Sequence, residues 1–269
     1  MDIACLSDTL IALKSVENRL VMAAHSKWAN IRFRKGAQDA KRGKLFTKLI
    51  REITVATKAG GPDTDNNPRL RSAVDKGLSN NMKRDTIETA IKKGGGAADS
   101  DSFDEIRYEG YGPAGTAVMV DCLTDNKNRT VAEVRHAFNK SGGNLGTSGS
   151  VDYMFQKLGV INFSNEHDED ALMEAALDAG ADDMITHEDG SFEVLTQPDD
   201  FMRVRDAVSG AGYAHEHAEV TMRADNLSPV NIKDAEKILH LLDVLEDLDD
   251  VQNVYSNADF PDEAMEEAE

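Results

Sequence analysis

The sequence predicts an α+β protein with three domains, one of them entirely helical. The length of 269 residues exceeds what one hydrophobic core usually organises. Apolar residues in the N-terminal third recur at helical spacing, whereas strand and helix patterns alternate in the remainder. An apolar content of 40%, with no apolar run near about 18 residues, indicates a globular protein without membrane spans.

Charge is distributed very unevenly along the chain. Residues 22–93 contain 17 Lys and Arg against 7 Asp and Glu, whereas residues 94–269 contain 11 against 39. Clustered cations attract phosphate backbones, and an acidic remainder limits nonspecific contacts. We therefore predict a nucleic-acid partner, with neither a membrane nor a small-molecule substrate. The oligomeric state, including a homo-oligomer, stays open.

Residues 1–21 are predicted to be an N-terminal extension, because Met22 offers an alternative start. The segment lacks the basic beginning of a secretory signal, and its three acidic residues argue against a transit peptide. Cys5 and Cys122 provide neither a disulfide framework nor a metal-ligand spacing. A buried, reduced Cys122 fits a cytoplasmic protein.

Residues 22–98 are predicted to form a basic helical domain. From residue 44 to 58, apolar side chains recur at spacings of four, four and three, with Lys and Arg in a second stripe beside them. One face of this helix therefore packs and another presents charge. Residues 94–102, which begin with three glycines, are expected to form a flexible, polar linker.

Two further helices are expected in this domain. Asn67 is placed to cap the second helix, with Pro68 as its first residue. Asp85 and Glu88 have the spacing of a capping box at the start of the third.

After the linker, predicted strands alternate with helices. A buried strand is expected over residues 116–123, and Thr130 with Glu133 has the pattern of a capping box that opens a helix. Residues 142–146 are expected to form a loop, and residues 151–155 a short strand.

Residues 156–222 are expected to form a ferredoxin-like domain, because the predicted order is strand, helix, strand, strand, helix, strand. The final helix and strand, within residues 231–255, have no partner there, so we expect them to return to the strand at 116–123. Residues 99–155 and 223–269 would then form one discontinuous α/β domain with an acidic tail, into which the ferredoxin-like domain is inserted.

The stretch from residue 25 to 58 is the candidate nucleic-acid surface. Lys and Arg recur every few residues, and two aromatic side chains lie among them. Such a surface attracts phosphates and unstacked bases. The simpler alternatives are a solvated helix face for the cations and a core position for the tryptophan. The candidate residues are Lys27, Trp28, Arg32, Arg34, Lys35, Lys41, Arg42, Lys44, Lys48 and Arg51.

We predict no enzyme, no cofactor and no metal site. Gly43-Lys44 fails the P-loop frame, because Leu45 stands where Ser or Thr should bind magnesium. His215, His217 and Glu219 alternate along a predicted strand and could ligate a metal, but a solvent-facing strand is the simpler reading.

Several long motifs closely resemble those of the YebC/PmpR family, and the resemblance spans Met22 to about Phe260. The motifs run from His25 to Ile31, Tyr108 to Gly115, Leu123 to Arg135, Gly142 to Gly146, Ala218 to Met222 and Leu245 to Tyr255. One departure is Asn81-Met82-Lys83-Arg84-Asp85-Thr86, where the family commonly has Asn-Met-Pro-Lys-Asp-Asn. The change removes a proline and makes that edge more basic.

The resemblance implies a cytoplasmic, non-enzymatic regulator of gene expression with a helical domain and two α/β domains, the third inserted into the second. Many members are labelled DNA-binding transcriptional regulators. Others, including a mitochondrial relative, look like translation factors that act at the ribosome and ease stalls at proline runs. The sequence leaves DNA and ribosomal RNA open as targets. A third alternative is a protein-interaction module whose acidic domains bind a basic partner.

Overall fold

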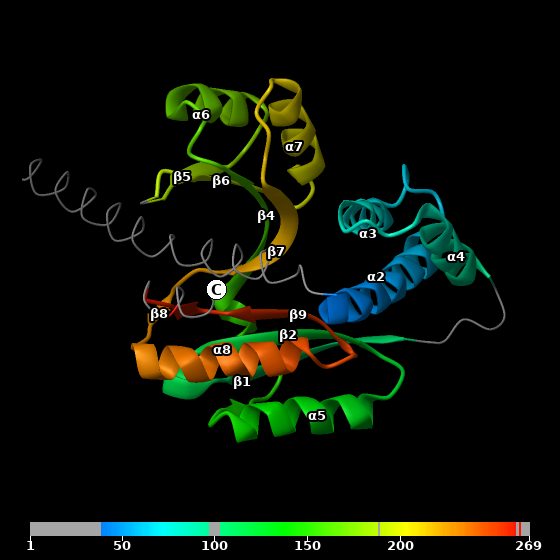
Figure 1. Ribbon diagram of the computed structural model, residues 1–269, viewed down its shortest axis with the longest axis vertical. Helices are drawn as coiled ribbons and strands as arrows, with labels where there is room; N and C mark the ends of the chain where they lie inside the picture. The colour runs from blue at the N-terminus through cyan, green and yellow to red at the C-terminus, as the bar shows by residue number, and fades with distance from the viewer. Residues whose placement is uncertain (1–38, 97–102, 188, 262–263, 265–269) are drawn as a thin grey trace, which may run out of the picture. The chain divides into compact units, whose positions relative to one another are not determined.

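The computed structural model describes residues 39–96, 103–187, 189–261 and 264, and it contains two compact units (Figure 1). Among the described residues, the larger unit comprises residues 39–152 and 233–256, and the smaller unit comprises residues 153–232 and 257–264. No described helix combines the length and apolar composition needed to cross a membrane.

The larger unit begins with three helices, which we call the helical module. They are α2 (Asp39–Gly60), α3 (Pro68–Ser79) and α4 (Arg84–Gly95). All three predicted helices are therefore confirmed. The side chains of Leu49, Ile53, Leu70 and Ile87 form part of their shared core. The predicted cap is also confirmed, because Asn67 Oδ1 accepts a hydrogen bond of 3.1 Å from the Leu70 amide.

Both predicted capping boxes are wrong. Helix α4 follows Lys83, and no side chain caps its first turn. Helix α5 (Lys127–Lys140) begins before Thr130, because Asn126 Oδ1 already accepts a hydrogen bond from the Arg129 amide at 3.1 Å. The Thr130 side chain lies inside the first turn of the helix and bonds elsewhere, as described below.

A four-stranded antiparallel sheet completes the larger unit, in the order β3-β1-β2-β9. Its strands are β1 (Asp104–Tyr111), β2 (Ala117–Thr124), β3 (Asn144–Leu145) and β9 (Val251–Ser256). The predicted return of the last strand is confirmed, because β9 pairs with β2 and places Val254 opposite Val120.

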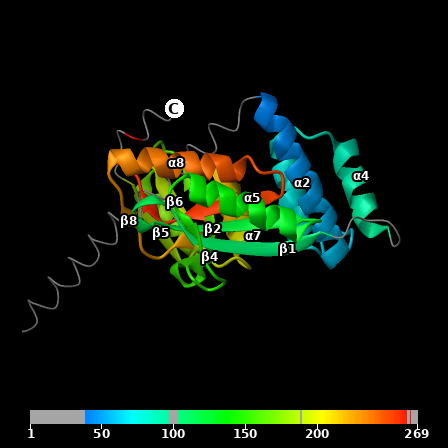
Figure 2. The same ribbon diagram turned by 90° about the horizontal axis from the view of Figure 1, so that it is seen from below.

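Helices α5 and α8 (Ile232–Glu246) lie side by side on one face of this sheet (Figure 2). A Cβ atom on Gly110 would lie 2.8 Å from the Phe138 ring of α5, and one on Gly112 would lie 3.3 Å from Leu241 of α8. The two glycines are alternate residues at the end of β1, so they share a face, and their missing side chains allow both helices to pack closely.

Three segments of the larger unit and its border differ from the sequence prediction. Strand β1 was not predicted, because its residues are mostly polar and only its end is buried. The loop expected at 142–146 contains the short strand β3. The strand expected at 151–155 is wrong. Its centre forms a 3₁₀ turn, η2 (Asp152–Met154), and a second such turn, η1 (Pro113–Gly115), joins β1 to β2.

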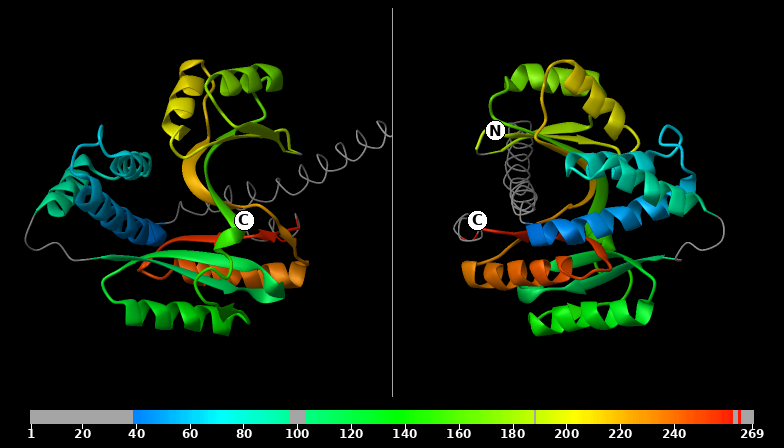
Figure 3. Two further views of the ribbon diagram at one scale, coloured as in Figure 1. Left: turned by 180° about the vertical axis from the view of Figure 1, so that it is seen from behind. Right: turned by 45° about the vertical axis from the view of Figure 1, so that its right-hand side comes forward.

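The smaller unit has the predicted order of elements, with helices α6 and α7 on one face of its sheet (Figure 3). The antiparallel sheet has the order β5-β6-β4-β7. The elements are β4 (Phe155–Phe163), α6 (Glu169–Asp178), β5 (Asp183–Thr186), β6 (Phe192–Thr196), α7 (Phe201–Gly210) and β7 (His217–Ala224). Strands β8 (Ser228–Pro229) and β10 (Ala258–Asp259) form a short parallel pair. The predicted domain boundaries and the insertion stay predictions.

Candidate nucleic-acid interface

The candidate residues divide into those with described side chains and those without. Lys27, Trp28, Arg32, Arg34 and Lys35 lie outside the described residues. Lys41 and Arg42 belong to helix α2, but their side chains are also outside the described part. The three that remain, Lys44, Lys48 and Arg51, point toward one segment of the larger unit.

That segment is residues 246–250, Glu-Asp-Leu-Asp-Asp, which we call the acidic loop. Lys48 Nζ donates to the Glu246 carbonyl oxygen at 2.6 Å. Lys44 Nζ donates to the Asp247 carbonyl oxygen at 3.0 Å and to its carboxylate at 3.3 Å. Because the last carbonyls of a helix lack partners within the helix and carry partial negative charge, the two ammonium groups stabilise the C-terminal end of α8.

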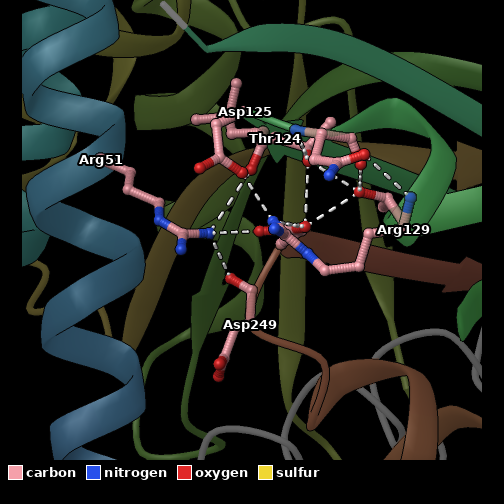
Figure 4. Close-up of polar contacts among 9 residues, drawn as sticks. Arg51, Thr124, Asp125, Arg129 and Asp249 are labelled. Carbon is pink, nitrogen blue, oxygen red and sulfur yellow. Dashed lines mark hydrogen bonds and ion pairs between the residues drawn. The ribbon is translucent and has the colours of Figure 1, made fainter. Parts of the chain in front are cut away.

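Arg51 joins the same loop one turn further along α2 (Figure 4). Its Nη1 atom donates to the Asp249 carbonyl oxygen at 2.7 Å and to Asp250 Oδ1 at 2.9 Å. The guanidinium also lies 5.4 Å from the centre of the Phe103 ring, within the range of a cation–π contact.

Asp250 is the centre of this polar cluster. Its side chain is only 3% exposed, and its Oδ2 atom accepts from Arg129 Nη2 at 2.8 Å and from the hydroxyls of Thr130 and Thr124 at 2.9 and 3.0 Å. Burial alone would raise the pKa of the carboxyl, but the bonds from Arg129, Thr130 and Thr124 outweigh it and leave the pKa lowered. Asp250 therefore stays ionised and joins the helical module to the sheet.

Three candidate residues thus have internal partners that sequence reasoning missed. The cationic stripe on α2 was visible in the sequence, and so was the acidic run that follows α8. Their pairing was not, because Arg51 and Asp250 are 199 positions apart. Acidic side chains at the C-terminal end of a helix interact unfavourably with the helix dipole unless cations lie nearby. The acidic run after α8 was therefore the one sequence feature that could have indicated nearby cations.

Other cations of the helical module are exposed. Lys83 and Arg84 follow the turn between α3 and α4, where Asn81 has a φ of 60° and Met82 is buried in the module core. Lys58 is exposed near the end of α2. Sequence reasoning noted the basic edge at Lys83-Arg84 but did not include it in the site.

A second buried carboxylate, Glu109, organises the loop that follows β3. Its side-chain oxygens accept hydrogen bonds from the backbone amides of Gly149, Val151 and Asp152 at 2.7, 2.7 and 2.8 Å. Burial raises the pKa of Glu109, whereas the bonds from these amides and the charge of Arg107 lower it, and the net shift is downward.

We expect E109Q to lower the free energy of unfolding by about 2 kcal/mol at pH 7, because an amide cannot accept all three bonds and its own N–H groups oppose the backbone donors. The native pKa lies below the usual 4.5, so the contribution of Glu109 is complete above that value and is lost as the pH falls through the native pKa. Urea unfolding at pH 7 and at pH 3 measures both effects. E133Q, at an exposed position of α5, is the control, and equal stabilities of the two variants at pH 7 would contradict this role.

The side chains that were weighed as metal ligands and set aside, those of His215, His217 and Glu219, do not converge on one point. His217 Nε2 lies 3.6 Å from Glu219 Oε1, while His215 Nδ1 lies 3.2 Å from the Ser209 hydroxyl. In the part of the chain that the structure describes, no group of three His, Cys, Asp or Glu side chains could hold a metal ion. Cys122 is buried as predicted, and burial is the main reason that its pKa rises to about 12.

The fold and these motifs match known proteins over most of the chain. Residues 26–97 match the TACO1/YebC protein N-terminal domain, and residues 103–258 match the TACO1/YebC second and third domain. A probable transcriptional regulatory protein of Methylococcus capsulatus is 68% identical over 246 residues, which is 91% of this chain and 99% of that protein. One from Hahella chejuensis is 62% identical over 245 residues, covering 91% of this chain and 98% of the relative.

A solved structure shows the same likeness. The crystal structure of a conserved hypothetical protein from Aquifex aeolicus has a TM-score of 0.74 and 45% sequence identity, and the match covers 83% of this chain and 93% of that one. With both parts matched by family models and relatives above 60% identity along nearly their whole length, the chain belongs to the TACO1/YebC family.

Proposed function

We propose that this protein is a non-enzymatic, nucleic-acid-binding regulator of gene expression that binds DNA through its basic N-terminal domain. The observation that carries the proposal is the segregation of charge, with 17 Lys and Arg against 7 Asp and Glu in residues 22–93 of a chain whose net charge is −19. The names of the relatives, probable transcriptional regulatory proteins, support DNA as the target.

The cations of this domain have two roles in the proposal. Those before residue 43, together with Lys83 and Arg84, contact phosphates. Lys44, Lys48 and Arg51 instead hold the helical module on the acidic loop, because their donors already have acceptors at 2.6 to 3.3 Å. Charge removed from the second group should change stability before it changes affinity.

We expect K83E/R84E to weaken binding to duplex DNA by about tenfold or more at 50 mM salt. Two lost phosphate contacts should also reduce the slope of log affinity against log salt by about 2. Fluorescence anisotropy with a labelled duplex, measured from about 50 to 300 mM KCl, tests both expectations.

The matched control is K157E/K233E, which makes the same change in net charge at exposed lysines outside the basic domain. A control that loses affinity as much as K83E/R84E would show that net charge alone governs binding. Wild-type protein that binds neither DNA nor RNA at low salt would overturn the proposal.

One observation favours a second candidate, a translation factor that binds ribosomal RNA. The exposed residues of α4 include Asp85 and Glu88 beside Arg84 and Lys92, and the Lys92 ammonium lies 3.9 Å from the Glu88 carboxylate. Carboxylates on the first two turns make this helix a poor reader of bases in a DNA groove, whereas recognition by shape and charge tolerates them. Sedimentation of lysate through sucrose at low and high salt separates the candidates. Migration with ribosomes that is reversed by salt favours the second, and protein only at the top of the gradient contradicts it.

A further inference from the structure

Helix α5 is an exception in the acidic part of the chain. Residues 94–269 contain 11 Lys and Arg against 39 Asp and Glu, and the 14 residues of α5 include four of these cations but only one of the acids. The cations are Lys127, Arg129, Arg135 and Lys140, and the acid is Glu133. A helix this basic is not expected from the composition around it.

The packing of α5 determines which of its side chains face outward. Thr130, Val134, Ala137 and Phe138 are buried, and Phe138 packs where Gly110 leaves room on β1. In Figure 2, α5 lies on the near side of the sheet of the larger unit, and no described helix or strand of that unit covers its outer side. The exposed residues of the helix are Lys127, Asn128, Arg129, Ala132, Glu133, Arg135, His136, Asn139 and Lys140, so one carboxylate stands among the cations.

The exposed cations of α5 differ in whether they already have partners. Arg129 belongs to the Asp250 cluster, and Lys127 Nζ lies 3.3 Å from Asp104 in an exposed pair. Arg135 and Lys140 form no ion pair with any described residue, although the surrounding chain is rich in carboxylates. Two unpaired cations in the acidic part of the sequence are therefore available to an external anion.

The side chains between the cations fit a phosphate backbone better than a protein surface. Asn128, Ala132, Arg135 and Asn139 follow one another at spacings of four, three and four, so they form one row along the helix. Asparagine amides donate to phosphate and sugar oxygens, and the small Ala132 permits close approach. No large apolar side chain is exposed on this face to serve as an anchor for a protein.

We propose that the outer face of α5 is a second nucleic-acid contact surface, which binds the phosphodiester backbone through Arg135, Lys140 and the neighbouring asparagines. The inference rests on the proposed function and adds to it a surface outside the basic N-terminal domain. The cations of α5 attract phosphates in a part of the sequence whose other charged residues are mostly acidic and repel them.

The test is the double variant R135E/K140E in the full chain, with K157E/K233E as the charge-matched control and R135K/K140R as the conservative variant. Binding to a labelled DNA duplex and to a labelled ribosomal RNA helix is measured by anisotropy over a salt series, with circular dichroism as the check on folding. For the nucleic acid that wild type binds, R135E/K140E should lose about tenfold in affinity and about 2 in salt slope, while the other two variants stay within about twofold of wild type.

Three other outcomes are distinguishable, and each contradicts the α5 surface. If wild type binds and R135E/K140E binds equally well with an unchanged slope, the α5 surface is overturned while the proposed function stands. If wild type binds neither nucleic acid, the result contradicts both the α5 surface and the proposed function. If R135E/K140E keeps its nucleic-acid affinity but loses binding to a polyglutamate probe, the face serves an acidic protein and the inference is overturned.

Discussion

D250A is expected to lower the free energy of unfolding by about 3 kcal/mol at pH 7. The Asp250 side chain is 3% exposed and accepts hydrogen bonds from Arg51, Arg129, Thr124 and Thr130. Removing the carboxylate takes away the acceptor of the buried Thr124 hydroxyl. Thr130, Arg51 and Arg129 each lose one acceptor and keep another. The estimate is at the low end for a buried charge, because Arg129 is 43% exposed and water can replace part of its bond.

The neighbouring residue supplies a close control. Asp249 is exposed and contributes only its backbone carbonyl to Arg51, so D249A should change stability by no more than about 0.5 kcal/mol. Urea unfolding followed by circular dichroism compares the two variants. Equal stabilities of D249A and D250A would show that the cluster contributes nothing beyond its backbone contacts.

The pH dependence gives an independent check. The pKa of Asp250 is lowered from 3.8, so its stabilising contribution is complete above that pH and is lost as the pH falls through the native pKa. The difference between wild type and D250N should therefore be largest at neutral pH and should shrink in acid. A difference that is constant from pH 7 down to pH 2 would contradict an ionised Asp250.

G94A is expected to destabilise the helical module by about 2 kcal/mol. A Cβ atom at Gly94 would lie 2.5 Å from the Thr54 carbonyl oxygen and 2.7 Å from the Thr57 Cβ atom, so α4 would have to move away from α2. The backbone oxygen cannot rotate out of the way as a flexible side chain can. The overpacking therefore exceeds the gain of about 1 kcal/mol that alanine brings to a helix.

The same substitution at the adjacent glycine, Gly95, is expected to have the opposite effect on stability. A Cβ atom at Gly95 would meet nothing within 4 Å, so G95A should be neutral or stabilise by up to about 1 kcal/mol. Thermal unfolding of the two variants beside wild type checks the contrast. If both alanines shift the midpoint in the same direction, the close approach of α4 to α2 does not govern the stability of the module.

Local signals predicted the helices and most strands well. The Asn67-Pro68 pair marked the start of α3 because the cap and the proline act within four residues, and β9 was assigned to β2 because the sequence offered it no other partner. Strand β1 was missed because its polar sequence lacks the alternation that marks a half-buried strand. Thr130 was misread as a cap because the capping-box pattern is local, whereas its hydroxyl bonds Thr124, Asn126 and Asp250, the last of which is 120 positions away.

The candidate interface was predictable only as a charge pattern. Composition located the basic domain, but it could not distinguish Lys83, which is exposed, from Lys48, which bonds the end of α8 at 2.6 Å. Arg135 and Lys140 were passed over because the net charge of the region around them is strongly negative. Both errors have one cause, since the environment of a charged side chain depends on residues that the chain brings close only after folding.

The 199 positions between Arg51 and Asp250 also determine how long after Arg51 the ribosome adds Asp250. At about 5–20 residues per second, a ribosome that has added Arg51 needs roughly 10–40 seconds to reach Asp250. During that interval the helical module has emerged, but the acidic loop does not yet exist to receive its cations. During synthesis, Lys44, Lys48 and Arg51 are therefore open to other anions until the acidic loop has been made, and the module cannot dock on that loop before then.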